Sequence, residues 1–237
     1  MSQLLFAVDT SGKNGSLALA RITPGESKIG VLEVVTLNGG AFSAQLVPQI
    51  AELLERYGCS KRDLRAFAVA SGPGSFTGLR VGLAAMKALA ETLQKPIVAI
   101  SLLEAVACSG TAGGRVLAVL DAGRNDVYVG DFEINTDAPT RGRMFSERLM
   151  SKEELLAEAA SLEAKGKGKV VITPDATLAE TVRSGGIQVE LIEYPNSAVI
   201  ARLGWERLRR GETVSPEELD ANYIRRSDTE LFLKSTP

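Results

Sequence analysis

The sequence contains no histidine among its 237 residues. Catalytic sites that pair histidine with serine or cysteine are therefore excluded, as are zinc and iron sites with imidazole ligands. Acid–base chemistry would have to use Asp, Glu, Lys or Tyr side chains, and a metal ion would need oxygen ligands, as Mg²⁺ does. A peptidase is nearly excluded for the same reason.

Cysteine and long apolar runs are also scarce. The two cysteines, Cys59 and Cys108, are too few for a disulfide framework, and we expect both to be plain thiols. No run approaches the roughly 18 apolar residues of a membrane span, and the first residues lack the pattern of a signal peptide. We therefore expect a cytoplasmic protein with no membrane partner. The net charge of −2 argues against a stand-alone nucleic-acid binder.

The spacing of apolar residues in the first half predicts the order strand, strand, strand, helix, strand, helix, strand. Pro48 lies inside the first predicted helix, so we expect a late start or a kink there. The predicted elements are strands at 3–9, 16–22 and 30–37, a helix at 43–57, a strand at 65–70, a helix at 79–94 and a strand at 96–101.

The second half repeats this order and adds a last helix. The repetition predicts a duplicated α/β fold with a mixed sheet in each lobe, an N-terminal lobe at 1–101 and a C-terminal lobe of the same topology at 102–237. The predicted elements are strands at 115–121, 126–134 and 143–149, helices at 152–164 and 174–184, strands at 169–173 and 187–193, and the last helix at 196–211.

A similar turn occurs at the front of each half. In "VDTSGKNGS" and in "VLDAGRNDVYVG" an aspartate ends an apolar run, and glycine, a basic residue and asparagine follow. Glycine and asparagine predict tight hairpin turns with positive φ angles. Each aspartate could coordinate Mg²⁺ through water or cap the amides of its own turn, and capping is the more frequent role. The residues concerned are Asp9 and Gly12 in the first turn and Asp121 and Gly123 in the second.

The segment "SGPGSFTGLRVG" at 71–82 is unusually rich in glycine. It lacks the Lys-Ser/Thr pair of a P-loop and the glycine spacing of a dinucleotide fingerprint. We interpret it as a tight strand-to-helix turn, where only Arg80 is positioned to help bind an anion. The helix that follows is apolar around most of its circumference, which indicates burial on more than one side. Either this chain covers it completely or a partner protein covers one face.

Two lobes of this kind, with Asp-Gly turns facing each other, resemble the actin, Hsp70 and sugar-kinase superfamily of ribonuclease-H-like folds. The resemblance implies that the two turns are phosphate-binding loops for ATP, either functional or degenerate, and that the aspartates act through a metal ion. One functional hypothesis is therefore an independent Mg-ATP-dependent ATPase or small-molecule kinase that uses Asp9 and Asp121.

The glycine-rich segment narrows the resemblance. Together with "AVDTS", "DAGRNDVY" and "NYIRRSD" it resembles the signature of the TsaB (YeaZ) proteins, which are grouped as glycoprotease-like. The sequence departs from that pattern at Gly123, where the pattern has arginine, and at Asp126, where it has glutamate. The family resemblance implies a non-catalytic partner of TsaD. With a TsaE-type ATPase, that pair transfers a threonylcarbamoyl group to N6 of adenosine 37 in tRNAs that read codons starting with A.

The same resemblance implies where partners bind. The helices after the third and fourth strands would pair with those of TsaD, or with a second copy in a homodimer. The isolated chain would need no cofactor, because the complex uses ATP and Mg²⁺, and tRNA would be contacted only within the complex. We expect Gly82→Arg to abolish the complex and to leave the fold intact. The predicted interface residues are Leu46, Ile50, Leu53, Gly78, Gly82, Leu83, Met86 and Leu89.

A cluster of arginines gives the C-terminal part a basic character. It is interpreted either as a solvated helix face or as a contact with tRNA phosphates in an assembly, and the solvated face is the more common case. The residues are Arg202, Arg207, Arg209, Arg210, Arg225 and Arg226.

Overall fold

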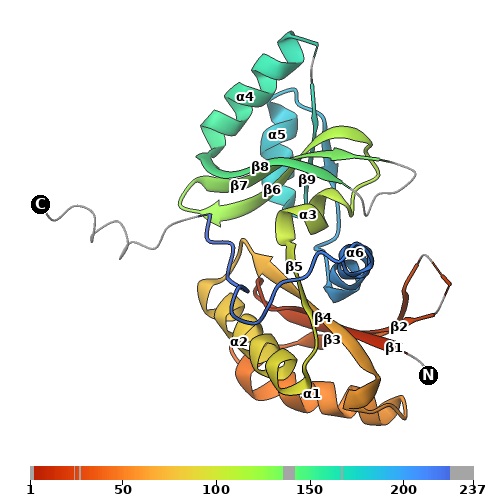
Figure 1. The fold of residues 1–237 in the computed structure, drawn as a ribbon. Coiled ribbons are helices and arrows are strands. Elements are labelled where there is room, and N and C mark those ends of the chain that lie inside the picture. The colour runs from red at the N-terminus through yellow and green to blue at the C-terminus, as the bar shows by residue number, and fades with distance from the viewer. Residues whose placement is uncertain (1–2, 24, 27, 136–141, 167, 225–237) are drawn as a thin grey trace, which may run out of the picture.

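The computed structural model describes residues 3–23, 25–26, 28–135, 142–166 and 168–224. The described chain folds into two α/β lobes, each built on a mixed five-stranded sheet (Figure 1). The duplicated α/β architecture and its repeated order of strands and helices, both predicted from the sequence, are confirmed.

The first lobe consists of β1 (Gln3–Asp9), β2 (Gly15–Ile22), β3 (Gly30–Leu37), α1 (Phe42–Arg56), β4 (Leu64–Gly72), α2 (Phe76–Leu93) and β5 (Ile97–Ser101). Its sheet has the order β3-β2-β1-β4-β5, antiparallel from β3 to β1 and parallel from β1 to β5. Successive side chains of the central strand point to opposite faces, and both faces are buried. Phe6 and Val8 pack with α1 and α2, whereas Leu5 and Ala7 pack on the opposite side.

The second lobe consists of β6 (Gly114–Gly123), β7 (Asp126–Ile134), β8 (Arg143–Ser151), α4 (Lys152–Ala164), β9 (Val170–Thr173), α5 (Ala176–Ser184) and β10 (Val189–Leu191). Its sheet has the equivalent order β10-β9-β6-β7-β8. Apolar residues of β6, β7 and β9 pack against α4 and α5, so these two helices cover the outer face of the sheet.

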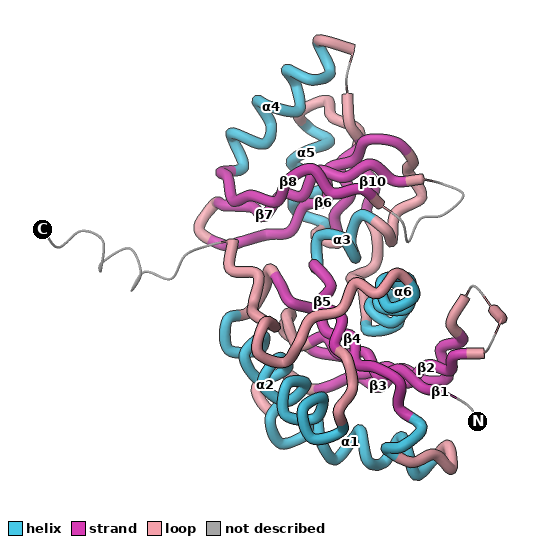
Figure 2. Tube along the Cα trace, in the orientation of Figure 1, coloured by secondary structure: helices cyan, strands magenta, loops and turns pink. Residues whose placement is uncertain are grey.

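Two helices cross between the lobes. α3 (Leu102–Ala107) follows the first sheet but contacts β6 and β7, and α6 (Ser197–Arg209) follows the second sheet but packs on β1, β2 and β4. Both lie between the two sheets (Figure 2). The close approach depends on small residues, because a Cβ on Gly204 would lie 2.5 Å from the Cβ of Ala68. The predicted boundary at 101/102 falls at the junction of β5 and α3.

Polar contacts hold the lobes together around these helices. Arg207 of α6 forms an ion pair of 2.6 Å with the buried Glu104 of α3, and its Nη1 donates to the carbonyl of Ala99 at 2.7 Å. The Ser16 hydroxyl accepts a hydrogen bond of 2.8 Å from the backbone N–H of Ser197. The inner layer of helices is therefore shared by both lobes.

Some element boundaries differ from the sequence prediction. α1 begins at Phe42 without the late start expected from Pro48, because Pro48 and Ala44 are exposed and water can solvate the Ala44 carbonyl that loses its partner. α2 begins at Phe76, three residues earlier than predicted, where the Ser75 hydroxyl accepts from the N–H of Gly78. α3 was not predicted, and within the described ranges no helix is long and apolar enough to span a membrane.

Candidate functional site

A cleft of about 770 Å³ lies between the lobes. Both aspartate turns reach it, the first through Ser11 to Lys13 and the second through Asp121 and Ala122. The N-terminal ends of α1, α2 and α5 contribute most of the remaining wall, together with aromatic side chains. The lining outside the turns includes Phe42, Ser43, Ser75, Thr77, Gly78, Tyr128, Asp175 and Tyr194.

The Asp9 carboxylate turns inward. It is only 2% exposed, and its Oδ1 accepts hydrogen bonds from the backbone N–H of Ser11 at 2.8 Å and from the Ser11 hydroxyl at 2.5 Å. Burial raises the pKa of Asp9 above its ordinary value of 3.8, and the two bonds from Ser11 oppose that rise. The side chain therefore holds the shape of its own turn.

Positive φ angles were predicted for the first turn, and that prediction is wrong. None of residues 9–16, all of which the structure describes, has a positive φ. Glycine is required there for space, because a Cβ on Gly15 would lie 2.7 Å from the carbonyl oxygen of Asp9 and 2.9 Å from the Phe42 ring.

The second turn has the backbone that the sequence predicted. Gly123, Arg124 and Asn125 have φ angles of 70°, 56° and 70°. The Asp121 carboxylate accepts a hydrogen bond of 3.1 Å from the N–H of Gly123 and forms an ion pair of 3.1 Å with the Lys152 ammonium. Asp121 thus caps its turn as Asp9 does, but it remains in contact with the cleft.

Asp9→Asn is expected to raise the melting temperature at pH 8 relative to the wild type. Burial raises the pKa of Asp9 in the folded state. As the pH rises, the Asp9 carboxyl group of the folded wild type therefore stays protonated to a higher pH than the same group in the unfolded chain does. The stability of the wild type thus falls as the pH rises from 3.8 through the folded-state pKa and stays low above it. Each unit of that shift corresponds to about 1.4 kcal/mol. Thermal melts at pH 4 and pH 8 measure the effect; a variant that melts below the wild type at pH 8 would show that the Ser11 bonds outweigh burial.

The glycine-rich segment packs against the first turn. A Cβ on Gly74 would lie 2.5 Å from the carbonyl oxygen of Ser11, and one on Gly78 would lie 2.0 Å from that of Thr10. The Ser75 N–H donates to the Ser11 carbonyl at 2.7 Å, and the Thr10 hydroxyl donates to the Gly78 carbonyl at 2.8 Å. These glycines bring α2 into direct contact with the end of β1.

Most of the predicted interface residues are covered by the chain itself. Leu46, Ile50, Leu53, Gly78, Gly82, Leu83 and Met86 are buried, and Leu89 is half-buried. Their role as partner contacts stays a prediction. The expectation that Gly82→Arg leaves the fold intact is wrong. A Cβ at this position would lie 2.3 Å from the Thr10 hydroxyl oxygen, so any larger side chain would force α2 and the first turn apart.

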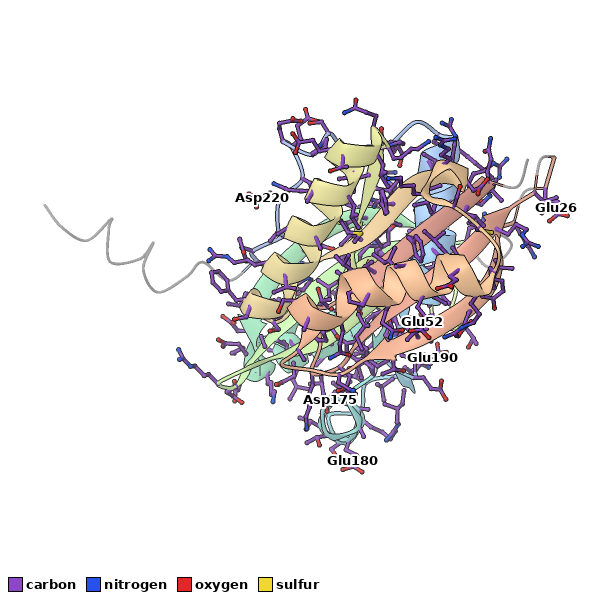
Figure 3. The ribbon with its side chains drawn as sticks, turned by 90° about the horizontal axis from the view of Figure 1, so that it is seen from below. Glu26, Glu52, Asp175, Glu180, Glu190 and Asp220 are labelled. Carbon is purple, nitrogen blue, oxygen red and sulfur yellow. The ribbon has the colours of Figure 1, made fainter. Side chains whose placement is uncertain are left out.

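Other residues of the same two helices are exposed. α1 and α2 run side by side on the outer face of the first sheet (Figure 3). Their exposed positions include charged residues, among them Glu52, Arg56 and Glu91, and a group of small or apolar side chains. Sequence reasoning missed this group because alanine contributes little to an apolar periodicity. We define the α1–α2 face as Ala44, Val47, Ala51, Thr77, Ala84 and Ala88, all exposed.

The predicted basic cluster is largely neutralised. Arg207 pairs with Glu104, Arg209 with Glu206 at 3.4 Å, and Arg210 with Glu212 at 3.0 Å. Arg202 is exposed, and Arg225 and Arg226 lie outside the described residues. A contact of this cluster with tRNA stays a prediction.

Comparison with known proteins identifies a matching family model and named relatives. The family model described as TsaD: tRNA N6-adenosine threonylcarbamoyltransferase matches residues 36–205. Proteins named tRNA threonylcarbamoyladenosine biosynthesis protein TsaB include one from Bacillus subtilis, 35% identical over 54% of this chain and 55% of the relative. Another, from Haemophilus influenzae, is 26% identical over 95% of this chain and 94% of the relative. The match thus spans about half the length of the Bacillus relative and nearly all of the Haemophilus one.

Solved structures share the fold. YeaZ from Pseudomonas aeruginosa superimposes with a TM-score of 0.74 at 23% identity, covering 93% of this chain and 99% of that one. A ROK family protein from Streptococcus pneumoniae gives a TM-score of 0.52 at 9% identity, covering 88% of this chain and 100% of that one. The two-lobed fold and the family model that matches most of the sequence lead to one assignment: the chain belongs to the TsaD-type family and, within it, to the TsaB (YeaZ) proteins.

Proposed function

We propose that the chain is an accessory subunit in the biosynthesis of threonylcarbamoyladenosine in tRNA. It binds a catalytic TsaD homologue and organises it for threonylcarbamoyl transfer to N6 of adenosine 37, in tRNAs that read codons starting with A. The names of the TsaB relatives support the pathway. The observation that carries the subunit role is the α1–α2 face.

The α1–α2 face is suited to contact with another protein. Val47 is 52% exposed, and alanines occupy the neighbouring outward positions of both helices. Alanine loses no side-chain entropy on burial, and small side chains let a second pair of helices approach closely. At about 1.5 Å per residue, the 18 residues of α2 give a contact strip about 27 Å long.

The family match suggests what covers this face. The TsaD family model spans 36–205 and so includes α1 and α2. A TsaD homologue therefore has equivalent helices, and like helices can pair about a two-fold axis, as in isologous dimers. A second copy of this chain fits the same surface, which gives a homodimer when the chain is alone.

We assign ATP use and catalysis to the complex and not to this chain. A TsaE-type ATPase, ATP and Mg²⁺ act with the TsaD homologue, and the isolated chain needs no cofactor. The bonds that Asp9 and Asp121 make within their own turns support this division. We assign any tRNA contact to the complex and not to the isolated chain, because Arg207 and Arg209 of α6 are already paired with Glu104 and Glu206. The complex acts in the cytoplasm.

Size-exclusion chromatography with light scattering tests the subunit role. The chain, the TsaD homologue of the same organism and their mixture are run separately at equal concentrations. We expect the mixture to give one equimolar complex and to deplete the homodimer. Separate elution at micromolar concentrations would contradict the proposal.

The cleft between the two aspartate turns favours one other candidate function, an independent Mg-ATP-dependent ATPase or kinase. Calorimetry with Mg-ATP on the isolated chain separates the two. We expect no tight binding. Tight binding that is lost in Asp9→Asn would favour the ATPase, because that variant keeps the size of the side chain but removes its charge.

A further inference from the structure

Three exposed side chains form a cluster at the start of α2. Phe76 and Arg80 lie one helical turn apart, and Tyr223 comes from the segment after α6. The rings of Phe76 and Tyr223 have centroids 5.3 Å apart. Arg80 places its Cζ 3.8 Å from the centroid of Phe76, and its Nε donates to the Tyr223 hydroxyl at 3.2 Å. We call these three residues the Arg80 clasp.

The clasp is exposed but held in place. Phe76 is 44% exposed and Tyr223 is 37% exposed, so neither ring belongs to a core. Asn222, next to Tyr223, donates from its N–H to the Ser71 carbonyl at 2.7 Å and from its side chain to Glu147 at 2.6 Å. Binding to a pre-organised group costs little side-chain entropy, so the clasp is a favourable anchor.

The outer edge of the guanidinium remains available. Within the described residues, the hydrogen bond that Arg80 makes uses Nε, and its Nη1 and Nη2 have no partner. The Phe76 ring also holds the guanidinium, because its centroid lies 3.8 Å from the Arg80 Cζ. A planar guanidinium presented in this way binds a carboxylate through two parallel hydrogen bonds.

Protein is a better occupant than RNA. The segment that leads to Tyr223 carries the exposed acids Glu217, Glu218 and Asp220, which would repel a run of phosphates. Arg80 already covers the ring of Phe76, which reduces the open ring surface that base stacking requires. Tyrosine and arginine are among the side chains most enriched at the energetic centres of protein interfaces.

The clasp also continues the α1–α2 face. Arg80, Ala84 and Ala88 follow one another at intervals of four residues and so lie on the same side of α2. We propose that the Arg80 clasp receives a carboxylate side chain of the TsaD homologue and anchors one end of that interface. This inference rests on the proposed subunit function and specifies the contact that orients the partner.

Calorimetry against the TsaD homologue tests the clasp. Arg80→Ala is expected to weaken affinity at least about tenfold at low salt. Arg80→Lys is expected to recover only part of it, because lysine keeps the charge but loses the planar fork. Arg143→Ala is the matched control, since Arg143 also lies over an exposed phenylalanine, Phe145, but in the second lobe. Its affinity should stay within about twofold of the wild type.

Salt dependence gives a second readout. The affinity of the wild type should fall more steeply between low and high salt than that of Arg80→Ala, because the variant lacks one interfacial ion pair. Thermal melts confirm that each variant is folded. If wild type and Arg80→Ala bind the homologue equally well, the clasp inference is wrong and the subunit function stands. If wild type does not bind, the subunit function fails and the inference with it. Loss of tRNA affinity alone would make the clasp an RNA contact and overturn the inference.

Discussion

Gly78→Ala is expected to lower the free energy of unfolding by about 3 kcal/mol or more. In an ordinary helix interior this substitution stabilises by about 1 kcal/mol, so the expected effect has the opposite sign. A Cβ on Gly78 would lie 2.0 Å from the carbonyl oxygen of Thr10, and backbone cannot move aside as a flexible side chain can. α2 would have to shift away from β1 and weaken the bonds that Thr10 and Ser75 make across this contact. Urea denaturation measures the change.

Gly30→Ala is the matched control. Gly30 has no positive φ, and a Cβ there would lie 3.8 Å from the Arg21 carbonyl oxygen, an ordinary contact. Its free energy of unfolding should change by less than about 0.5 kcal/mol. A Gly78→Ala protein as stable as the wild type would show that close packing of the glycine-rich segment against the first turn does not contribute to stability.

Ala88→Arg is expected to weaken binding to the TsaD homologue by about a hundredfold or more, with no loss of stability. Ala88 is exposed on α2, so arginine fits the isolated chain without strain. In the complex the same side chain would lie between closely packed helices, where its volume and its charge both disfavour binding. Calorimetry gives the affinity, and a thermal melt checks the fold.

Ala160→Arg controls for the chemistry of this change. Ala160 is also an exposed alanine in a helix, but α4 lies on the outer face of the second lobe. We expect normal affinity from this variant. Equal losses from both substitutions, or from neither, would remove the α1–α2 face as the partner-binding surface.

The order of strands and helices could be predicted because it depends on local periodicity. Alternating or continuous apolar runs mark the strands of both sheets. Within the described residues, the prediction missed two short elements, α3 and a single 3-10 turn at Lys61–Asp63. The exchange of α3 and α6 between the lobes could not be predicted. It depends on contacts between residues far apart in the chain, such as Gly204 with Ala68.

The candidate site was predictable only in part. The sequence identified both aspartate turns and the glycine-rich segment as special. It could not tell whether the small residues Gly78 and Gly82 adapt α2 to a partner or to Thr10 of the same chain, because both interpretations need the same smooth helix surface. The Arg80 clasp was equally hidden, since Tyr223 lies 143 residues after Arg80.

Threonylcarbamoyl transfer in a reconstituted system tests the central claim most directly. The TsaD homologue and the TsaE-type ATPase of the same organism are incubated with tRNA, ATP and the threonylcarbamoyl donor, with and without this chain. We predict that modified tRNA forms only when the chain is present, and that the yield rises until chain and homologue are equimolar. Equal yields with and without the chain would contradict the account.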